Sequence, residues 1–570
     1  MRIALIGAEL EENLGLRYMA SALEQQGHEA LIVPFNQESD IPQVVTSVLA
    51  AAPAIVGLSM VFTGRAREFC RLAVKLRTAG FSGHLTAGGH FAALNCQQLL
   101  GDFSEFDSIA LGEGEELICN LAAHLDDLSG LAGFCYRAAD GSLRTNPGLG
   151  NPENLDALPF PRRGEFHRYF GQPIASILSS RGCWRECAFC SIDAWYRSGG
   201  GKKFRIRSID NIVAEMSELY HRHGIRIFNF QDDNFFLPDP KRALARFKAL
   251  RKGLKQAGVD KIAIAVKARP DSINRAALEV LEDLGIFRVF LGVENASQRG
   301  LDNLNRRNTV AQIENALKIL NDYDLHIAYN LLLFEPDASM EDIAINLDFM
   351  ERHVDNPFNF CRAEAYAYTG LEKKLRADNI LSGDYFGFDY RIKNPQVETF
   401  HKIANYAFFD RNFSDYGLHY FNMEVDFSYL LLRRFFPERL TRELRAEVRA
   451  FIKETNVDTH RHLCRIYDLV LATDPADQHQ IKEIMKSLRR QVDERSRALR
   501  AQGERILDRL QAAYAGEPLP EPWLEPVSGF RPGELAAGSQ GWSTLNPDNP
   551  FGMLRQPIPY EVFKRRLQGC

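Results

Sequence analysis

With 570 residues, the chain is too long for one hydrophobic core, so about three or four folding units are expected. With 45% hydrophobic and 25% charged residues, its composition is ordinary for a soluble protein that can bury hydrophobic cores. A net charge of −5 argues against a general nucleic-acid-binding surface. No apolar run reaches the roughly 20 residues that cross a bilayer, and the first residues lack a signal-peptide pattern. We therefore expect a cytoplasmic protein with neither a membrane nor a nucleic acid as partner.

The first 127 residues alternate short apolar runs with segments of helical periodicity. Such alternation predicts an α/β domain, in which a doubly wound parallel sheet has helices on both faces. Ligands of these sheets bind at the carboxyl ends of the strands. The expected strands are 2–7, 29–35, 54–60, 83–89 and 107–114.

Three interpretations compete for this domain. A nicotinamide-binding domain would carry Gly-x-Gly-x-x-Gly after the first strand, where the chain has GAELEENLG at 7–15. A receiver-like regulatory domain would carry a phosphorylatable acidic residue near the third strand, where Ser59 and Met60 stand. Neither pattern is present, and the third interpretation rests on a resemblance.

Four segments of this region carry the resemblance: LGLRYMASALEQQGHEA (14–30), VGLSMVFTG (56–64), TAGGHFAAL (86–94) and ALGEGEE (110–116). They resemble the cobalamin-binding domain that precedes the catalytic barrel in B12-dependent radical SAM enzymes. In those enzymes the GGH and GEGE loops hold the corrin or its nucleotide tail. The resemblance therefore implies that cobalamin is contacted by Ser59, Gly88, Gly89, His90, Gly112, Glu113 and Gly114.

One part of the older cobalamin-binding pattern is missing from the first loop. Many mutases and methyltransferases carry Asp-x-His-x-x-Gly there and supply an imidazole to cobalt, whereas the first histidine of this chain is His28. We therefore expect no histidine ligand to cobalt from this loop. A degenerate domain that binds nothing is the alternative.

Residues 128–173, rich in Gly, Pro and Asn, are expected to form a linker with a small hairpin.

Three of the ten cysteines, Cys183, Cys187 and Cys190, lie within eight positions, whereas the others are scattered singly. Structural zinc is closed by four ligands, usually in two pairs, and a disulfide would leave one thiol over in a reducing compartment. Three thiolates on a 4Fe-4S cluster would leave one iron open for a further ligand. This spacing therefore favours an iron-sulfur cluster.

The cysteine segment is similar to the cluster loop of the radical SAM family, which also has an aromatic residue before the third cysteine, here Phe189. The resemblance makes Cys183, Cys187 and Cys190 the metal-binding catalytic residues. It implies that the open iron chelates S-adenosylmethionine and that an electron then cleaves it to a 5′-deoxyadenosyl radical. It also implies an external electron donor such as flavodoxin or ferredoxin.

Six further apolar runs with helical segments between them predict a partial (β/α)6 barrel over 174–370, with reactive groups at the carboxyl ends of its strands. The family places contacts to S-adenosylmethionine after strand two, and we expect side chains after strands three and four to face its ribose, its carboxylate or the substrate. Ordinary ion pairs at the barrel rim are the alternative. The expected strands are 174–182, 225–236, 261–271, 287–296, 326–334 and 358–368. The corresponding candidates are Asp232, Asp233, Asn234, Lys267, Arg269 and Glu294.

Beyond residue 370 the pattern changes to strong helical periodicity with many charges, which predicts a mainly α-helical region over 371–570. An aromatic-rich stretch at 405–429 could close the barrel mouth over substrate, but core packing is the favoured interpretation.

The resemblance implies a B12-dependent radical SAM methyltransferase. Such an enzyme cleaves S-adenosylmethionine reductively and transfers a methyl group from methylcobalamin to an unactivated carbon of a small-molecule or peptide substrate. A carbon radical cannot use the electrophilic methyl of S-adenosylmethionine, whereas methylcobalamin can deliver a methyl group to it. The protein would supply placement and exclude solvent.

Three alternatives remain open. Other members of the same family use the corrinoid for a non-methylating rearrangement, oxidation or cyclisation. A transfer-RNA methylthiolase would need three further grouped cysteines in the N-terminal domain, where Cys70, Cys96 and Cys119 are separated by whole elements. A corrinoid or iron-sulfur binding module without turnover is the alternative from another class.

Overall fold

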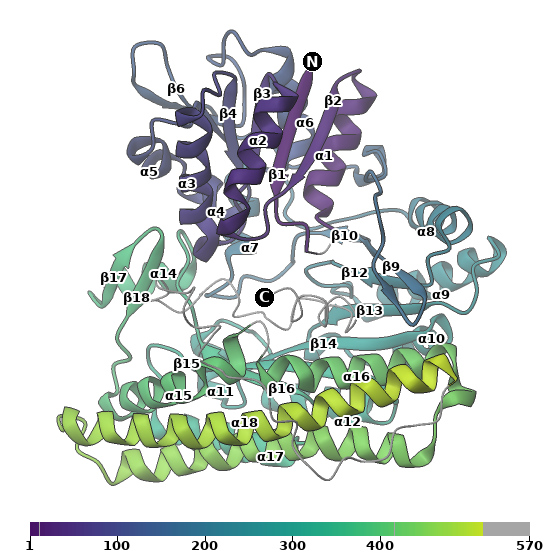
Figure 1. The fold of residues 1–570 in the computed structure, drawn as a ribbon, viewed down its shortest axis with the longest axis vertical. Coiled ribbons are helices and arrows are strands. Elements are labelled where there is room, and N and C mark those ends of the chain that lie inside the picture. The colour runs from purple at the N-terminus through teal and green to yellow at the C-terminus, as the bar shows by residue number, and fades with distance from the viewer. Residues whose placement is uncertain (11, 415–416, 517–570) are drawn as a thin grey trace.

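The computed structural model describes residues 1–10, 12–414 and 417–516. In Figure 1 an N-terminal α/β domain lies at the top, a second α/β domain lies below it, and long C-terminal helices run along the bottom. None of the helices in these ranges is long and apolar enough to span a membrane.

The N-terminal domain has a sheet in the order β2-β1-β3-β4-β5-β6-β7, in which β1 to β5 run parallel. The order reverses between β1 and β3, the place where ligands bind in open α/β sheets. The predicted doubly wound sheet is thus confirmed. Its parallel strands are β1 (Arg2–Gly7), β2 (Glu29–Pro34), β3 (Ile55–Ser59), β4 (His84–Gly88) and β5 (Ser108–Ala110). Its main helices are α1 (Leu14–Gln25), α2 (Ile41–Ala51), α3 (Thr63–Thr78), α4 (His90–Leu94), α5 (Cys96–Asp102) and α6 (Gly114–Ala123).

The small hairpin expected between the two α/β domains is formed by β6 (Phe134–Arg137) and β7 (Leu143–Thr145). It is not a free connector, because β6 pairs antiparallel with β5 and extends the first sheet. Phe134 and Cys135 of β6 are buried in the cores on either side of that sheet.

The second domain has a sheet in the order β16-β15-β14-β13-β12-β9-β8. Neighbouring strands from β9 to β16 are all parallel and follow one another in chain order, as a partial (β/α)6 barrel requires. All six predicted strands are present: β9 (Gln172–Ile177), β12 (Ile227–Phe230), β13 (Ala263–Ala268), β14 (Ile286–Glu294), β15 (His326–Phe334) and β16 (Phe358–Arg362). The helices between them include α7 (Ser191–Gly199), α8 (Ile209–His223), α9 (Pro240–Gln256), α10 (Arg275–Leu284), α12 (Val310–Asn321) and α13 (Met340–Arg352).

The region after residue 370 is mainly helical over its described part, as predicted. Part of the predicted 371–570 region, residues 517–570, lies outside the described residues. In the aromatic-rich stretch, Phe421 and Phe427 share a core with Ile174 and Ala265 of the barrel sheet, so these residues pack as core. The elements are α14 (Gly370–Ala377), β17 (Leu381–Asp384), β18 (Gly387–Tyr390), α15 (Pro395–Phe413), α16 (Leu418–Phe435), α17 (Arg442–Leu471) and α18 (Gln478–Ala515).

The β17–β18 hairpin connects this last region to the N-terminal domain. The Tyr385 hydroxyl donates a 2.7 Å hydrogen bond to Asp102, and the Phe386 ring lies 5.5 Å from the ring of Phe91. The N-terminal domain is therefore held by the barrel below it and by this hairpin, which lies below α3 and α5 (Figure 1).

Acidification should weaken the fold at His401 on α15. The ring lies 5.0 Å from the ring of Phe334, and burial lowers the pKa of His401 from 6.5 to about 3. Below pH 6.5 the His401 imidazole is therefore protonated in the unfolded chain but stays neutral in the folded chain. The stability that the buried neutral ring contributes is complete above pH 6.5 and is lost as the pH falls toward 3. The His401→Gln substitution should reduce the slope of the free energy of unfolding against pH by about 1.4 kcal/mol per pH unit between pH 6 and 4. Denaturant unfolding of both proteins at several pH values checks this, and parallel curves would contradict it.

Candidate active site

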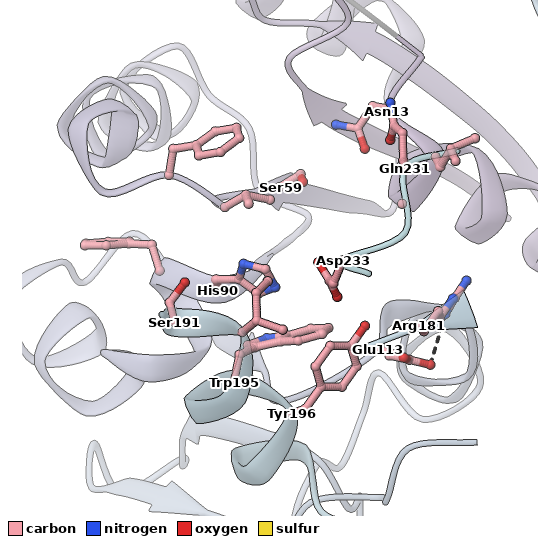
Figure 2. A pocket seen from close by; sticks show the side chains of 18 of the residues that line it. Asn13, Ser59, His90, Glu113, Arg181, Ser191, Trp195, Tyr196, Gln231 and Asp233 are labelled. Atoms are coloured by element: carbon pink, nitrogen blue, oxygen red, sulfur yellow. Dashed lines mark hydrogen bonds and ion pairs between the residues drawn. The ribbon is translucent and has the colours of Figure 1, made fainter. Parts of the chain in front are cut away.

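A cavity of about 780 Å³ lies between the two α/β domains. The N-terminal domain contributes residues at the carboxyl ends of β3 and β4, including Ser59 and Gly88. The barrel contributes residues at or near the carboxyl ends of β12, β13 and β14, such as Gln231, Lys267 and Glu294. Both sheets therefore present their ligand-binding ends to one space, and Figure 2 shows Asn13 and Ser59 of the N-terminal domain around it together with Gln231 and Asp233 of the barrel domain.

The three clustered cysteines all line this cavity, together with Phe189. The loop that carries them begins after β10 (Ser180–Arg181) at Gly182, which has a φ of +79°. A Cβ on Gly182 would lie 1.9 Å from the Lys203 carbonyl oxygen, so only glycine fits there. The loop ends at Cys190, which is the N-cap residue of α7.

Burial raises the pKa of the Cys183 and Cys190 thiols. Two cations lie beside the third thiol, since Nη1 of Arg306 is 3.1 Å and Nη1 of Arg269 is 3.8 Å from the Cys187 Sγ. These guanidinium groups place positive charge beside a side chain that binds metal through its sulfur. In the described part of the chain, no three His, Cys, Asp or Glu side chains are grouped so that they could hold a single metal ion.

The three polar residues predicted after strand two do not share one environment. Asp233 lines the cavity, and burial raises the pKa of its carboxyl although Lys267 opposes the shift. Asp232 and Asn234 are buried and are not among the residues that line the cavity. The Asp232 carboxylate accepts hydrogen bonds of 2.6 Å from the Ser179 hydroxyl and 2.5 Å from the Ser180 hydroxyl, so it braces the segment that leads into the cysteine loop.

The candidates after strands three and four, Lys267, Arg269 and Glu294, all line the cavity. Glu294 is a non-glycine residue with a φ of +65°, and such left-handed residues cluster at functional sites. Burial raises the pKa of its carboxyl, with Arg306 opposing the shift at 3.8 Å. Arg269 also binds Asp271, through a 2.9 Å contact.

All of the predicted corrin-loop residues line the cavity as well. At Gly89, φ is +93° and a Cβ would lie 3.0 Å from the Met60 carbonyl oxygen, so a side chain is excluded. The next residue, His90, places its ring 4.4 Å from the ring of Trp195, which belongs to the barrel domain. Burial lowers the pKa of His90 to about 4, so its imidazole is neutral at pH 7.

Glu113 differs from the glycines that flank it. Its side chain is 4% exposed, and its carboxylate accepts hydrogen bonds of 2.9 Å from Arg181 and 2.5 Å from Arg205. Both arginines belong to the barrel domain, and the Arg181 contact is drawn in Figure 2. Glu113, which the resemblance predicts to contact cobalamin, thus lines the cavity while its carboxylate is held by these two arginines.

The loop after β1 is anchored to the barrel in a similar way. Glu12, which lines the cavity, accepts a 2.6 Å hydrogen bond from the Ser176 backbone N–H of β9 and a 3.0 Å bond from Arg163. The neighbouring Asn13 also lines the cavity.

Sequence reasoning did not identify several polar and aromatic residues of this site. Arg181 and Arg205 flank the cysteine loop. The sequence feature that could have indicated them is their positive charge, which complements the acidic GEGE segment. The positions of Trp195 and Arg306 in the cavity depend on contacts between distant segments.

Two family models match the chain in order. Residues 7–122 match the B12 binding domain, and residues 177–347 match the Radical SAM superfamily. An uncharacterized methyltransferase of Pyrococcus horikoshii is 25% identical over 375 residues, which cover 65% of this chain and 79% of that protein.

Two solved structures share the fold. OxsB, a cobalamin-dependent S-adenosylmethionine radical enzyme solved with aqua-cobalamin and S-adenosylmethionine bound, gives a TM-score of 0.63 at 16% identity, covering 90% of this chain and 80% of its own. TsrM of Kitasatospora setae, a radical S-adenosylmethionine methyltransferase solved with tryptophan substrate and a S-adenosylmethionine analogue, gives 0.57 at 17% identity, covering 66% and 76%. At these identities the structural likeness shows the fold alone.

Proposed function

Because its B12-binding domain is followed by a radical SAM domain, this chain belongs to the cobalamin-dependent radical SAM enzymes, and we propose that it transfers a methyl group to an unactivated carbon of a small-molecule or peptide substrate. The resemblance to this family that the sequence showed is confirmed, as is the cofactor set of a 4Fe-4S cluster, S-adenosylmethionine and cobalamin. Methyl transfer is supported by the relative from Pyrococcus horikoshii, which is named a methyltransferase.

The residues of the cavity fit these cofactors. Three thiols open into it from one loop, and the glycine-rich loops that contain Gly88, Gly89 and Gly112 line it from the other domain. When bound, the cluster and S-adenosylmethionine supply a 5′-deoxyadenosyl radical, and the corrinoid supplies the methyl group. We propose an external donor such as flavodoxin or ferredoxin as the source of the electron.

The protein's own groups would position and shield the reactants. Asp232 holds the segment before the cysteine loop, while Arg269 and Arg306 place positive charge beside Cys187. His90 and Trp195 pack edge to face across the domain boundary, where they exclude water from the cavity. A dry cavity protects a carbon radical from side reactions.

One observation carries this proposal. The cysteine loop and the GGH and GEGE loops, which come from different domains, line the same cavity. A substrate bound in this cavity would therefore lie beside both the cysteine loop and the loops proposed to hold the corrin.

The proposal is tested with S-adenosylmethionine that carries a trideuterated methyl group. The anaerobically reconstituted holoprotein is incubated with it, a strong reductant and a metabolite extract of the source organism. We expect 5′-deoxyadenosine, a trideuteromethyl group on the corrinoid extracted in the dark, and extract components that carry three deuterium atoms. Formation of 5′-deoxyadenosine without label on either the corrinoid or any extract component would contradict methyl transfer.

A further inference from the structure

The loop Gly112–Glu113–Gly114 faces the cavity and also contacts the barrel domain. All three residues line the cavity, and the φ of +126° at Gly112 keeps the loop in a turn that few other residues adopt. The Glu113 carboxylate is engaged by Arg181 and Arg205 of the other domain, as Figure 2 shows for Arg181. A group bound against this loop is thus linked to the barrel through one side chain.

The ion network around Glu113 is buried. Arg181 also binds Glu115 at 2.6 Å, and the side chains of Arg181 and Arg205 are 10% and 1% exposed. Each guanidinium also lies over a ring, Arg181 at 4.8 Å from the centroid of Tyr18 and Arg205 at 5.3 Å from that of Tyr196. These contacts leave the guanidinium groups little freedom to follow a displaced carboxylate.

The two arginines are also fixed to the cysteine loop. Arg181 of β10 pairs directly with Arg205 of β11 (Arg205–Ile206) in an antiparallel ribbon. Gly182 and Cys183 follow Arg181 immediately, and Gly182 has no room for even one further carbon. A shift of Glu113 would therefore be transmitted to the first cluster ligand over two residues.

Stability alone does not explain this network. Replacing a buried ion pair by apolar groups is often neutral or stabilising, whereas geometry is strictly defined when each charge has bidentate or paired partners. A role in positioning therefore fits the network better than a role in holding the fold together.

We propose that Glu113 is a positioning residue that couples the corrin-binding loop to the cluster loop, so that loading of the cluster and binding of cobalamin favour each other. The proposal rests on the cofactor set of the proposed function but not on methyl transfer. Coupling between two sites is reciprocal, so it can be measured from the cobalamin side alone.

The test compares hydroxocobalamin binding to cluster-loaded and cluster-free full-length protein, with affinity followed by absorbance and tryptophan fluorescence. In the unaltered protein we expect the loaded form to bind at least about fivefold more tightly, the lower end of typical coupling. Glu113→Gln, which keeps the side-chain size, should bring the ratio of the two affinities close to one. Glu116→Gln is the matched control, because Glu116 is exposed on the same helix start and should leave the ratio unchanged.

Several outcomes would overturn the proposal. A ratio of one in the unaltered protein would show that the two sites are not coupled. An unchanged ratio in Glu113→Gln would show that Glu113 does not carry the coupling, and an equal loss of affinity in both forms would make it a direct cofactor contact. Should Glu113→Gln fail to fold, Arg205→Lys weakens the contact to the same carboxylate from the other partner. This variant is judged by the same ratio of cobalamin affinities. None of these measurements depends on methyl transfer, so they can be interpreted even if the protein transfers no methyl group.

Discussion

Alanine in place of Cys183, Cys187 or Cys190 should reduce the cleavage of S-adenosylmethionine to the level measured without enzyme. Two thiolates cannot hold a cubane that needs three, and without the cluster no electron reaches the sulfonium. All three thiols line the cavity, so each variant should have the same effect. The measurement is the yield of 5′-deoxyadenosine from anaerobically reconstituted protein under strong reductant.

The matched control is Cys464→Ala on α17, a partly buried cysteine that does not line the cavity. It should keep both its iron content and its cleavage activity. The cluster variants should still bind cobalamin and keep its red colour, because the corrin loops belong to the other domain. Cleavage that survives in any cluster variant would show that the three thiols do not act together.

Gly182→Ala should also abolish cluster assembly, although residue 182 is not itself a ligand. The backbone there has a φ of +79°, and the new Cβ would lie 1.9 Å from the Lys203 carbonyl oxygen. A backbone atom cannot rotate away as a side chain can, so the ribbon of β10 and β11 must separate and displace Cys183. We expect iron per chain to fall to a small fraction of that in the unaltered protein.

Gly224→Ala separates this clash from the conformational preference of glycine. Gly224 caps the end of α8 with a φ of +69°, and nothing lies within 4 Å of its missing Cβ. This variant should be less stable by about 1 kcal/mol and should assemble the cluster normally. Equal iron contents in the two variants would contradict the role assigned to Gly182.

Much of the fold could be predicted because buried parallel strands have a local signature. Runs such as Ile327 to Phe334 are apolar except for Asn330, and the structure buries both faces of the strand that contains this run. The cysteine loop was equally visible, since Cys183, Cys187 and Cys190 are close in sequence and act from one segment. The order of the strands then placed this loop at the ligand-binding end of the barrel.

The direction of individual side chains could not be predicted in the same way. Asp232 and Asp233 are adjacent, yet only Asp233 lines the cavity, because the Ser179 and Ser180 hydroxyls hold the Asp232 carboxylate in the interior. For Glu113, the partners are 68 and 92 residues away in sequence. Such contacts depend on how the two domains meet, and no motif or periodicity encodes that.

Electron paramagnetic resonance of the anaerobically reconstituted and reduced holoprotein, recorded with and without S-adenosylmethionine, tests most directly whether Cys183, Cys187 and Cys190 hold a cluster with an open iron. If they do, the reduced protein should show the signal of a 4Fe-4S cluster, and S-adenosylmethionine should alter it by binding to that iron. A reduced protein without this signal, or with a signal that S-adenosylmethionine leaves unchanged, would contradict it.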